Sequence, residues 1–397
     1  MTRGTPESDG RAHAAAPERP AVTWWEIAFR AAIALVLLAT VDAAVARARP
    51  LPEPAEAAAP YRLPESGELP DLVRLAQSTG ADPDNRRVVF LGSSPAWGYG
   101  VTDPSDTVPS VFSRHTAADG DRLLVYNLAS RGQMADDFTV LAHSIGGRAD
   151  IYVVQLTYTL LDPGARAERP ARFPELADAL GVSVDGTLAV ELGVSPAPAL
   201  DLDPPLDREV RRVSALYRER YALLSPGGQR IEDAAFRRFA KRFRSWAAPA
   251  PALDETPPKS DPFDLQEPAD QLIAVDRYRG VANLWLHPRN PELRRLAALA
   301  AYFDEQGIPA VFYLSPVNEE ALDFNGPEDW ARYDRNVARV RHSVEGSGGI
   351  LLDYGRGHGL PQGAFVDITH LTGEGSRVFG ERLYSDVASA APGVLRP

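Results

Sequence analysis

Two residues that could form a nucleophile and its base stand near opposite ends of the chain. Ser94 lies in the sequence Gly-Ser-Ser-Pro that follows a short apolar run, and His370 follows Asp367 by three positions. A carboxylate at this spacing can accept a hydrogen bond from one imidazole nitrogen, which leaves the other free to take a proton from a serine. Each residue also has a plainer interpretation, because a serine after a strand often caps a helix and a loop histidine beside an aspartate is common.

The segments around these residues predict an α/β fold. Short apolar runs bounded by polar residues or glycine are typical of buried strands, and helical patterns lie between several of them. The predicted strands are Arg87–Leu91, Leu123–Leu128, Ile151–Leu156, Ala310–Leu314 and Gly349–Asp353, and the clearest helices are Pro291–Gln306 and Gly375–Val387. This alternation indicates a parallel sheet with helices on both faces. In such a sheet the site forms at the carboxyl ends of the strands, where Ser94 stands.

The order of three motifs resembles one family. A Gly-x-Ser turn follows the first strand, Asn127 and Gly132 frame an Asn-x-x-x-x-Gly turn after the second, and an Asp-x-x-His segment precedes the closing helix. This layout resembles the SGNH (GDSL-type) serine hydrolases. The resemblance implies a three-layer, flavodoxin-like parallel sheet in which Ser94 is the nucleophile and Asp367 and His370 complete a catalytic triad. It also implies an oxyanion hole formed by the N–H groups of Ser94 and Gly132.

Two positions depart from the family's usual pattern within the resembling region, roughly residues 86–397. Ser93 stands where the common motif has an aspartate that is not a triad member, and this serine is the nearest competitor of Ser94 for His370. After the third strand the family often supplies an asparagine as a further oxyanion donor, whereas this chain has Gln-Leu-Thr. Losing one such donor can cost about 2.7–4 kcal/mol. We therefore expect a substitute, with Thr157 as the candidate.

The chain also has the sequence Leu-Ser-Pro-Val-Asn at Leu314–Asn318. With this segment and the two departures, it resembles the DltD-type proteins of teichoic-acid D-alanylation and SGNH-like proteins that acetylate exported polysaccharides. The likeness implies an extracytoplasmic acyl-ester hydrolase or O-acyltransferase that acts on a carbohydrate or cell-envelope polymer through an acyl-serine intermediate. Its partners would be an acyl donor, a hydroxyl acceptor and a membrane-bound O-acyltransferase. The alternative is a non-catalytic accessory protein that only docks such an acyltransferase.

Residues 23–46 predict a membrane-spanning helix or a signal sequence. Ala31–Val41 carries no charge, and Trp24 and Trp25 suit an aromatic belt at a membrane interface. A cleaved signal peptide also fits, because an Ala-Val-Ala segment of the small-x-small form follows. We expect single-pass anchoring in a bacterial membrane with the catalytic domain outside the cytoplasm, and secretion after cleavage as the alternative.

The other segments differ from the α/β pattern in composition. We expect a disordered tail over residues 1–22, a proline-rich linker over 47–85 and a largely helical insertion over 163–290 within the domain. Two Arg-rich helical stretches are predicted inside the insertion, at Asp207–Leu224 and Ile231–Trp246.

Composition excludes several other function classes. The 397 residues carry a formal net charge of -12, which disfavours nucleic-acid binding because phosphate contacts need a basic face. Cysteine is absent, so disulfides, thiolate metal sites and cysteine nucleophiles are excluded. No metal-spaced histidine pair and no phosphate-binding glycine motif is present in the sequence, so we expect neither a metal nor a cofactor.

Overall fold

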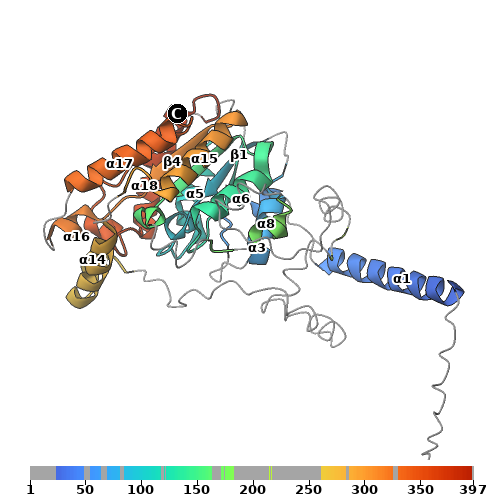
Figure 1. Ribbon diagram of the computed structural model, residues 1–397. Helices are drawn as coiled ribbons and strands as arrows, with labels where there is room; N and C mark the ends of the chain where they lie inside the picture. Colours follow the sequence, from blue (N-terminus) through green and yellow to red (C-terminus); the bar gives the residue numbers. More distant parts are fainter. Residues whose placement is uncertain are drawn as a thin grey trace, which may run out of the picture. The chain divides into compact units, whose positions relative to one another are not determined.

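A computed structural model shows the arrangement of the chain (Figure 1). It describes residues 24–48, 54–63, 69–80, 85–117, 120, 122–162, 171–173, 175–182, 214, 216, 261–282, 286–324 and 330–395. Two compact units are distinguished, Met1–Arg49 and Pro50–Pro397. The predicted tail and the stretch at Ile231–Trp246 lie outside the described residues, as does Asp207–Leu224 apart from Ser214 and Leu216.

The first unit contains the helix α1, Trp24–Ala48. Within it, Ala28–Arg47 is long and apolar enough to cross a membrane, since 20 residues at about 1.5 Å each span the hydrocarbon core. The large apolar side chains of its central part, such as Leu35 and Val36, are exposed. The predicted apolar helix is therefore present, and a signal sequence near the N-terminus has the same properties.

The second unit is built on a five-stranded parallel sheet. Its strands are β1 Arg86–Leu91, β2 Leu123–Asn127, β3 Ile151–Leu156, β4 Ala310–Leu314 and β5 Ile350–Asp353. All five predicted strands are confirmed, with ends that differ by at most one residue. The order β2-β1-β3-β4-β5 is that of flavodoxin-like doubly wound sheets, in which the direction of winding reverses between β1 and β3. A ligand site is expected outside the carboxyl ends of those two strands.

Helices cover both faces of this sheet, because alternate strand residues belong to two separate apolar clusters. Val89 and Leu91 face one cluster, and Val88 and Phe90 face the other. The first cluster includes α3 Leu69–Ser78, α6 Ala135–Ile145, α8 Leu176–Leu180, α15 Pro291–Glu305 and α17 Trp330–Glu345. The second includes α5 Val108–Phe112, α14 Pro268–Ala282, α16 Glu319–Phe324 and α18 Gly373–Ala390.

Short helices occupy several of the connections between these elements. They are α2 Pro54–Ala57, α4 Ser94–Trp97, η1 Pro104–Asp106, η2 Gly146–Arg148, η3 Tyr158–Leu161, η5 Phe263–Leu265 and η6 Gln362–Ala364. The most important of them for the site is α4, because it starts at Ser94, with only two residues between it and the end of β1.

The prediction of a linker over residues 47–85 is wrong for its described part. Leu72, Leu75 and Ala76 of α3 lie on one helix face and are fully or almost fully buried in the first apolar cluster. The N–H of Ala59 also donates to the carbonyl oxygen of Val125, a residue of the edge strand β2, at 2.6 Å. The high proline content suggested an extended spacer, but the amphipathic stretch within it buries enough apolar surface to join the domain.

The described ends of the insertion are fixed to the domain. Where it begins, the carboxylate of Asp137 in α6 accepts hydrogen bonds from the N–H groups of Arg172 and Phe173 at 2.8 and 3.0 Å. Where it returns, the N–H of Phe263 donates to the carbonyl oxygen of Phe365 at 2.7 Å. The returning segment therefore supports the loop that carries Asp367 and His370.

Candidate active site

The turn after β1 presents Ser94 at the carboxyl edge of the sheet. Ser93 keeps an extended backbone (φ -103°, ψ -152°), and α4 begins at the next residue. The carbonyl oxygen of Ser94 accepts hydrogen bonds from the N–H groups of Gly98 and Tyr99, and the indole N–H of Trp97 donates to the carbonyl oxygen of Leu63. These bonds hold the short helix in place, so the backbone position of Ser94 is determined by its surroundings.

The loop before α18 carries Asp367 and His370 and is closed on itself. The N–H of Val366 donates to the carbonyl oxygen of His370 at 2.8 Å, and a neighbouring loop donates to Ile368 through the N–H of Asn318 at 2.9 Å. Thr372 then caps α18, with its hydroxyl oxygen accepting from the N–H of Gly375. The loop is thus fixed to α18 at its C-terminal end and to the neighbouring loop at Ile368.

Gly100 allows this loop to approach the turn after β1. Its backbone has φ +86°, and a Cβ atom there would lie 2.7 Å from a methyl carbon of Val366 and 2.9 Å from the carbonyl oxygen of Leu371. A side chain would therefore push the two segments apart, in addition to straining the backbone. The glycine keeps the segment following Ser94 in direct contact with the segment that carries His370.

The structure brings Ser94, His370 and Asp367 into one chain of hydrogen bonds. The distance from His370 Nε2 to Ser94 Oγ is 2.8 Å, and from His370 Nδ1 to Asp367 Oδ2 it is 2.7 Å. Both distances are within hydrogen-bond range. Ser94 and His370 are 276 positions apart in the sequence. Ser93 is directed elsewhere, because its hydroxyl bonds to the side chain of Gln155 at 3.2 Å. Of the two adjacent serines, Ser94 is the one that contacts His370.

The carboxylate of Asp367 fixes the tautomer of His370. Its Oδ1 accepts the backbone N–H groups of Thr369 and His370, each at 2.8 Å, which leaves Oδ2 for the imidazole. Burial pushes the pKa of Asp367 upward, but the charge and ring hydrogen bond of His370 and the two backbone N–H groups outweigh it, so the pKa lies below its ordinary value of 3.8. An ionised carboxylate only accepts, so Nδ1 carries the proton and Nε2 can accept from the Ser94 hydroxyl.

Tyr99 and Arg131 also belong to this region, and no sequence motif pointed to either residue. The Tyr99 ring lies 4.5 Å from the His370 ring between centroids, tilted by 47°, and the guanidinium carbon of Arg131 lies 5.1 Å from the Tyr99 centroid. Tyr99 restricts rotation of the imidazole by packing against it. Arg131 links this stack to the turn after β2, which contains Gly132.

Gly132 and Thr157, the other predicted site residues, lie at the same edge of the sheet. Gly132 is in the turn after β2 with φ +75°, and the N–H of Ser130 in that turn donates to the carbonyl oxygen of Gly92 at 3.3 Å. Thr157 is buried directly after β3, the neighbour of β1. Their roles as oxyanion donors remain predictions.

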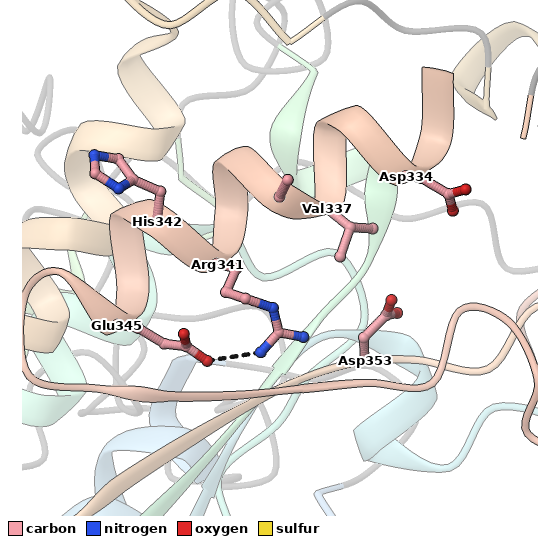
Figure 2. A pocket seen from close by; sticks show the side chains of 7 residues that line it. Asp334, Val337, Arg341, His342, Glu345 and Asp353 are labelled. Carbon is pink, nitrogen blue, oxygen red and sulfur yellow. Dashed lines mark hydrogen bonds and ion pairs between the residues drawn. The ribbon is translucent and has the colours of Figure 1, made fainter. Parts of the chain in front are cut away.

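A hollow on α17 and β5 is a separate feature of the surface (Figure 2). Its Arg341 donates to Glu345 at 2.7 Å and to the carbonyl oxygen of Leu351 at 3.0 Å, while Asp353 accepts the N–H of Gly355. These charged groups already bond to one another and to the backbone. Two strands also separate β5 from β1, so the hollow lies apart from the Ser94 site.

Neither similarity to known proteins nor the arrangement of potential metal ligands assigns a further role to the site. No protein-family model matches the chain, and no curated protein matches it significantly. Within the described ranges, no group of three or more His, Asp or Glu side chains is arranged to hold a metal ion. The interpretation of the site therefore depends on its own geometry.

We predict that Asp367→Asn removes a contribution to stability that is sensitive to acid. Because the folded-state pKa lies below the ordinary 3.8, ionised Asp367 stabilises the fold at pH values above 3.8, and this contribution is lost as the pH falls through the folded pKa. The difference in Tm between the native protein and the variant should be present in full at pH values above 3.8 and shrink as the pH falls below that value. Calorimetry across this range measures it, and a difference independent of pH would contradict the prediction.

Proposed function

We propose that this protein is a serine-dependent acyl-ester hydrolase or O-acyltransferase. The observation that carries the proposal is the hydrogen-bonded chain from Asp367 through His370 to Ser94, with distances of 2.7 and 2.8 Å. A carboxylate, an imidazole and a hydroxyl in this order are the parts of a nucleophile activated by a general base. Their location near the point where the sheet reverses its winding, at the carboxyl ends of the strands, supports a ligand site there.

In the first step, Ser94 Oγ attacks the carbonyl carbon of an acyl ester while its proton passes to His370 Nε2. Asp367 stabilises the resulting imidazolium through Nδ1–H. The carbonyl electron pair moves onto oxygen, where the N–H groups of Ser94 and Gly132, with Thr157 as the third donor, stabilise the negative charge. When the C=O bond re-forms, the alcohol leaves with the proton from His370, and an acyl-serine remains.

In the second step, a hydroxyl acceptor attacks the acyl-serine as His370 removes its proton, and Ser94 Oγ leaves and regains a proton. Water as acceptor gives hydrolysis, and a sugar or polyol hydroxyl gives acyl transfer. The choice depends on water exclusion and on acceptor binding. We propose a carbohydrate or cell-envelope polymer as the acceptor and a membrane-bound O-acyltransferase as the partner, in line with the resemblance to SGNH proteins of this kind.

The same resemblance leads us to propose an SGNH-type three-layer domain anchored by α1 and positioned outside the cytoplasm. Helices on both faces of the sheet and the strand order β2-β1-β3-β4-β5 support the fold assignment. The length and apolar character of Ala28–Arg47 support a single span.

The triad can be tested with an activated ester and a fluorophosphonate probe. The native protein should hydrolyse p-nitrophenyl acetate and form a covalent adduct on Ser94, located by mass spectrometry of the peptide. Ser94→Ala and His370→Ala should each abolish turnover, and the double variant should be no worse than either single one, because the residues act as a unit.

Ser93→Ala is the matched control, since it removes the adjacent hydroxyl that bonds to Gln155 instead of His370. It should still form the adduct, because the backbone N–H of Ser93 keeps its bond to Gln155 at 2.8 Å. A native protein that is folded yet forms no adduct would overturn the enzymatic proposal and favour the accessory role.

The role of Gly132 can be tested against a glycine with a similar backbone. Gly132→Ala should lower turnover by about 10²-fold, because a side chain at φ +75° turns the N–H away from the reacting oxygen. Gly307 has φ +66° and no atom within 4 Å of an added Cβ, so Gly307→Ala imposes comparable backbone strain away from the site. Equal turnover in the two folded variants would remove Gly132 from the oxyanion hole.

Topology can be tested with reporters fused after Pro397. An alkaline phosphatase fusion, which is active only outside the cytoplasm, should be active, and a green fluorescent protein fusion exported by the same route should be dark. The reverse pattern would place the domain in the cytoplasm and contradict the proposed localisation.

A further inference from the structure

The side-chain amide of Gln155 is buried at the carboxyl edge of the sheet and bonds to Ser93, the residue before Ser94. Gln155, the penultimate residue of β3, is fully buried in an otherwise apolar strand. Its Oε1 accepts the backbone N–H of Ser93 at 2.8 Å and the Ser93 hydroxyl at 3.2 Å, and its Nε2 donates to Ser315 Oγ at 2.8 Å. A backbone N–H can only donate, so the oxygen of the amide must face Ser93, and this fixes the orientation of the side chain.

These bonds connect the ends of three neighbouring strands. Ser93 follows β1, Gln155 lies in β3, and Ser315 follows β4, where its N–H donates to the carbonyl oxygen of Leu156 at 3.0 Å. The sheet reverses its winding between β1 and β3, so the connections that follow these two strands diverge and leave an opening for a ligand outside their carboxyl ends. The Gln155 amide connects the strands across that opening.

We propose that Gln155 is the positioning residue that orients the Ser94 nucleophile, and this inference rests on the proposed function. Ser93 has an extended backbone, and successive side chains of an extended segment point in opposite directions. Holding both the N–H and the hydroxyl of Ser93 against Gln155 therefore directs Ser94 to the other side, where its Oγ meets His370 Nε2 at 2.8 Å. Gln155 touches neither Ser94 Oγ nor the substrate in this scheme, and it acts through Ser93.

The glycine of the Gly-Ser-Ser turn is explained by the same contact. A Cβ atom on Gly92 would lie 2.8 Å from Gln155 Cβ, 2.9 Å from Gln155 Oε1 and 2.7 Å from Ala96 Cβ. Real Cβ atoms essentially never approach that closely. Any larger residue would force the turn away from Gln155, so glycine is needed for the amide to reach Ser93.

Gln155→Met tests the proposal, because methionine has a similar size and neither accepts nor donates these bonds. We expect the folded variant to lose about 10²-fold in kcat for p-nitrophenyl acetate with little change in KM, since a displacement of about 1 Å at a nucleophile costs that much. The rate of fluorophosphonate labelling should fall in parallel. Gln155→Glu, which keeps an acceptor for Ser93, should recover part of the loss.

Asn336 provides a matched control elsewhere in the domain. This buried amide of α17 likewise accepts a backbone N–H, from Leu286 at 3.1 Å, and donates to a hydroxyl, that of Tyr158 at 2.6 Å. Asn336→Leu should lower Tm about as much as Gln155→Met and leave kcat unchanged. A merely structural Gln155 would give the same result as Asn336, that is, a lower Tm with native kcat.

The outcomes separate this inference from the proposed function. If the native full-length protein neither turns over the ester nor labels at Ser94, the proposed function fails. If the native protein reacts and folded Gln155→Met reacts at the native rate, only the role of Gln155 is overturned. Should Gln155→Met not fold, Ser315→Ala decides, because it loosens the same amide from its far side: a several-fold loss of kcat supports the proposal, and a native kcat refutes it.

Discussion

The candidate site depends on the 2.8 Å hydrogen bond between Ser94 Oγ and His370 Nε2. The two residues are 276 positions apart, so no local structure can bring them together. The parallel sheet provides the common edge, and the contact of Gly100 with Val366 and Leu371 brings the two loops to within bonding distance. The other contacts of the site, including the bond by which Asp367 fixes the imidazole tautomer, matter only once the complete fold has brought Ser94 and His370 together.

Much of this arrangement could be predicted from the sequence because parallel strands buried on both faces appear as continuous apolar runs. The runs at Ile151–Leu156 and Ala310–Leu314 match β3 and β4 in full. The amphipathic helix α3 was missed, since the prolines and acidic residues around it suggested an extended spacer. Its apolar face is only one side of ten residues, too short a pattern to outweigh the surrounding composition.

The contacts that orient the site could not be predicted, because they join side chains from different elements. Nothing in the local sequence indicates that Tyr99 packs on the His370 ring or that Gln155 bonds to the N–H of Ser93. Because successive side chains of an extended segment alternate, Ser93 and Ser94 are expected to point to opposite sides. Which of the two serines faces His370 depends on which neighbouring side chains can form hydrogen bonds with them. A single polar residue within the apolar run Ile-Tyr-Val-Val-Gln-Leu was the one available signal for Gln155.

Stability and orientation rest on the same polar bonds at this edge of the sheet. Ser93, Gln155 and Ser315 are each less than a tenth exposed, and a buried polar group without a partner costs roughly 1–3 kcal/mol. The folded state therefore penalises any turn geometry that breaks these bonds, including one in which Ser93 faces His370 in place of Ser94. Satisfying the buried amide selects one rotation of the Gly-Ser-Ser turn, and that rotation is the one that presents Ser94 to the imidazole.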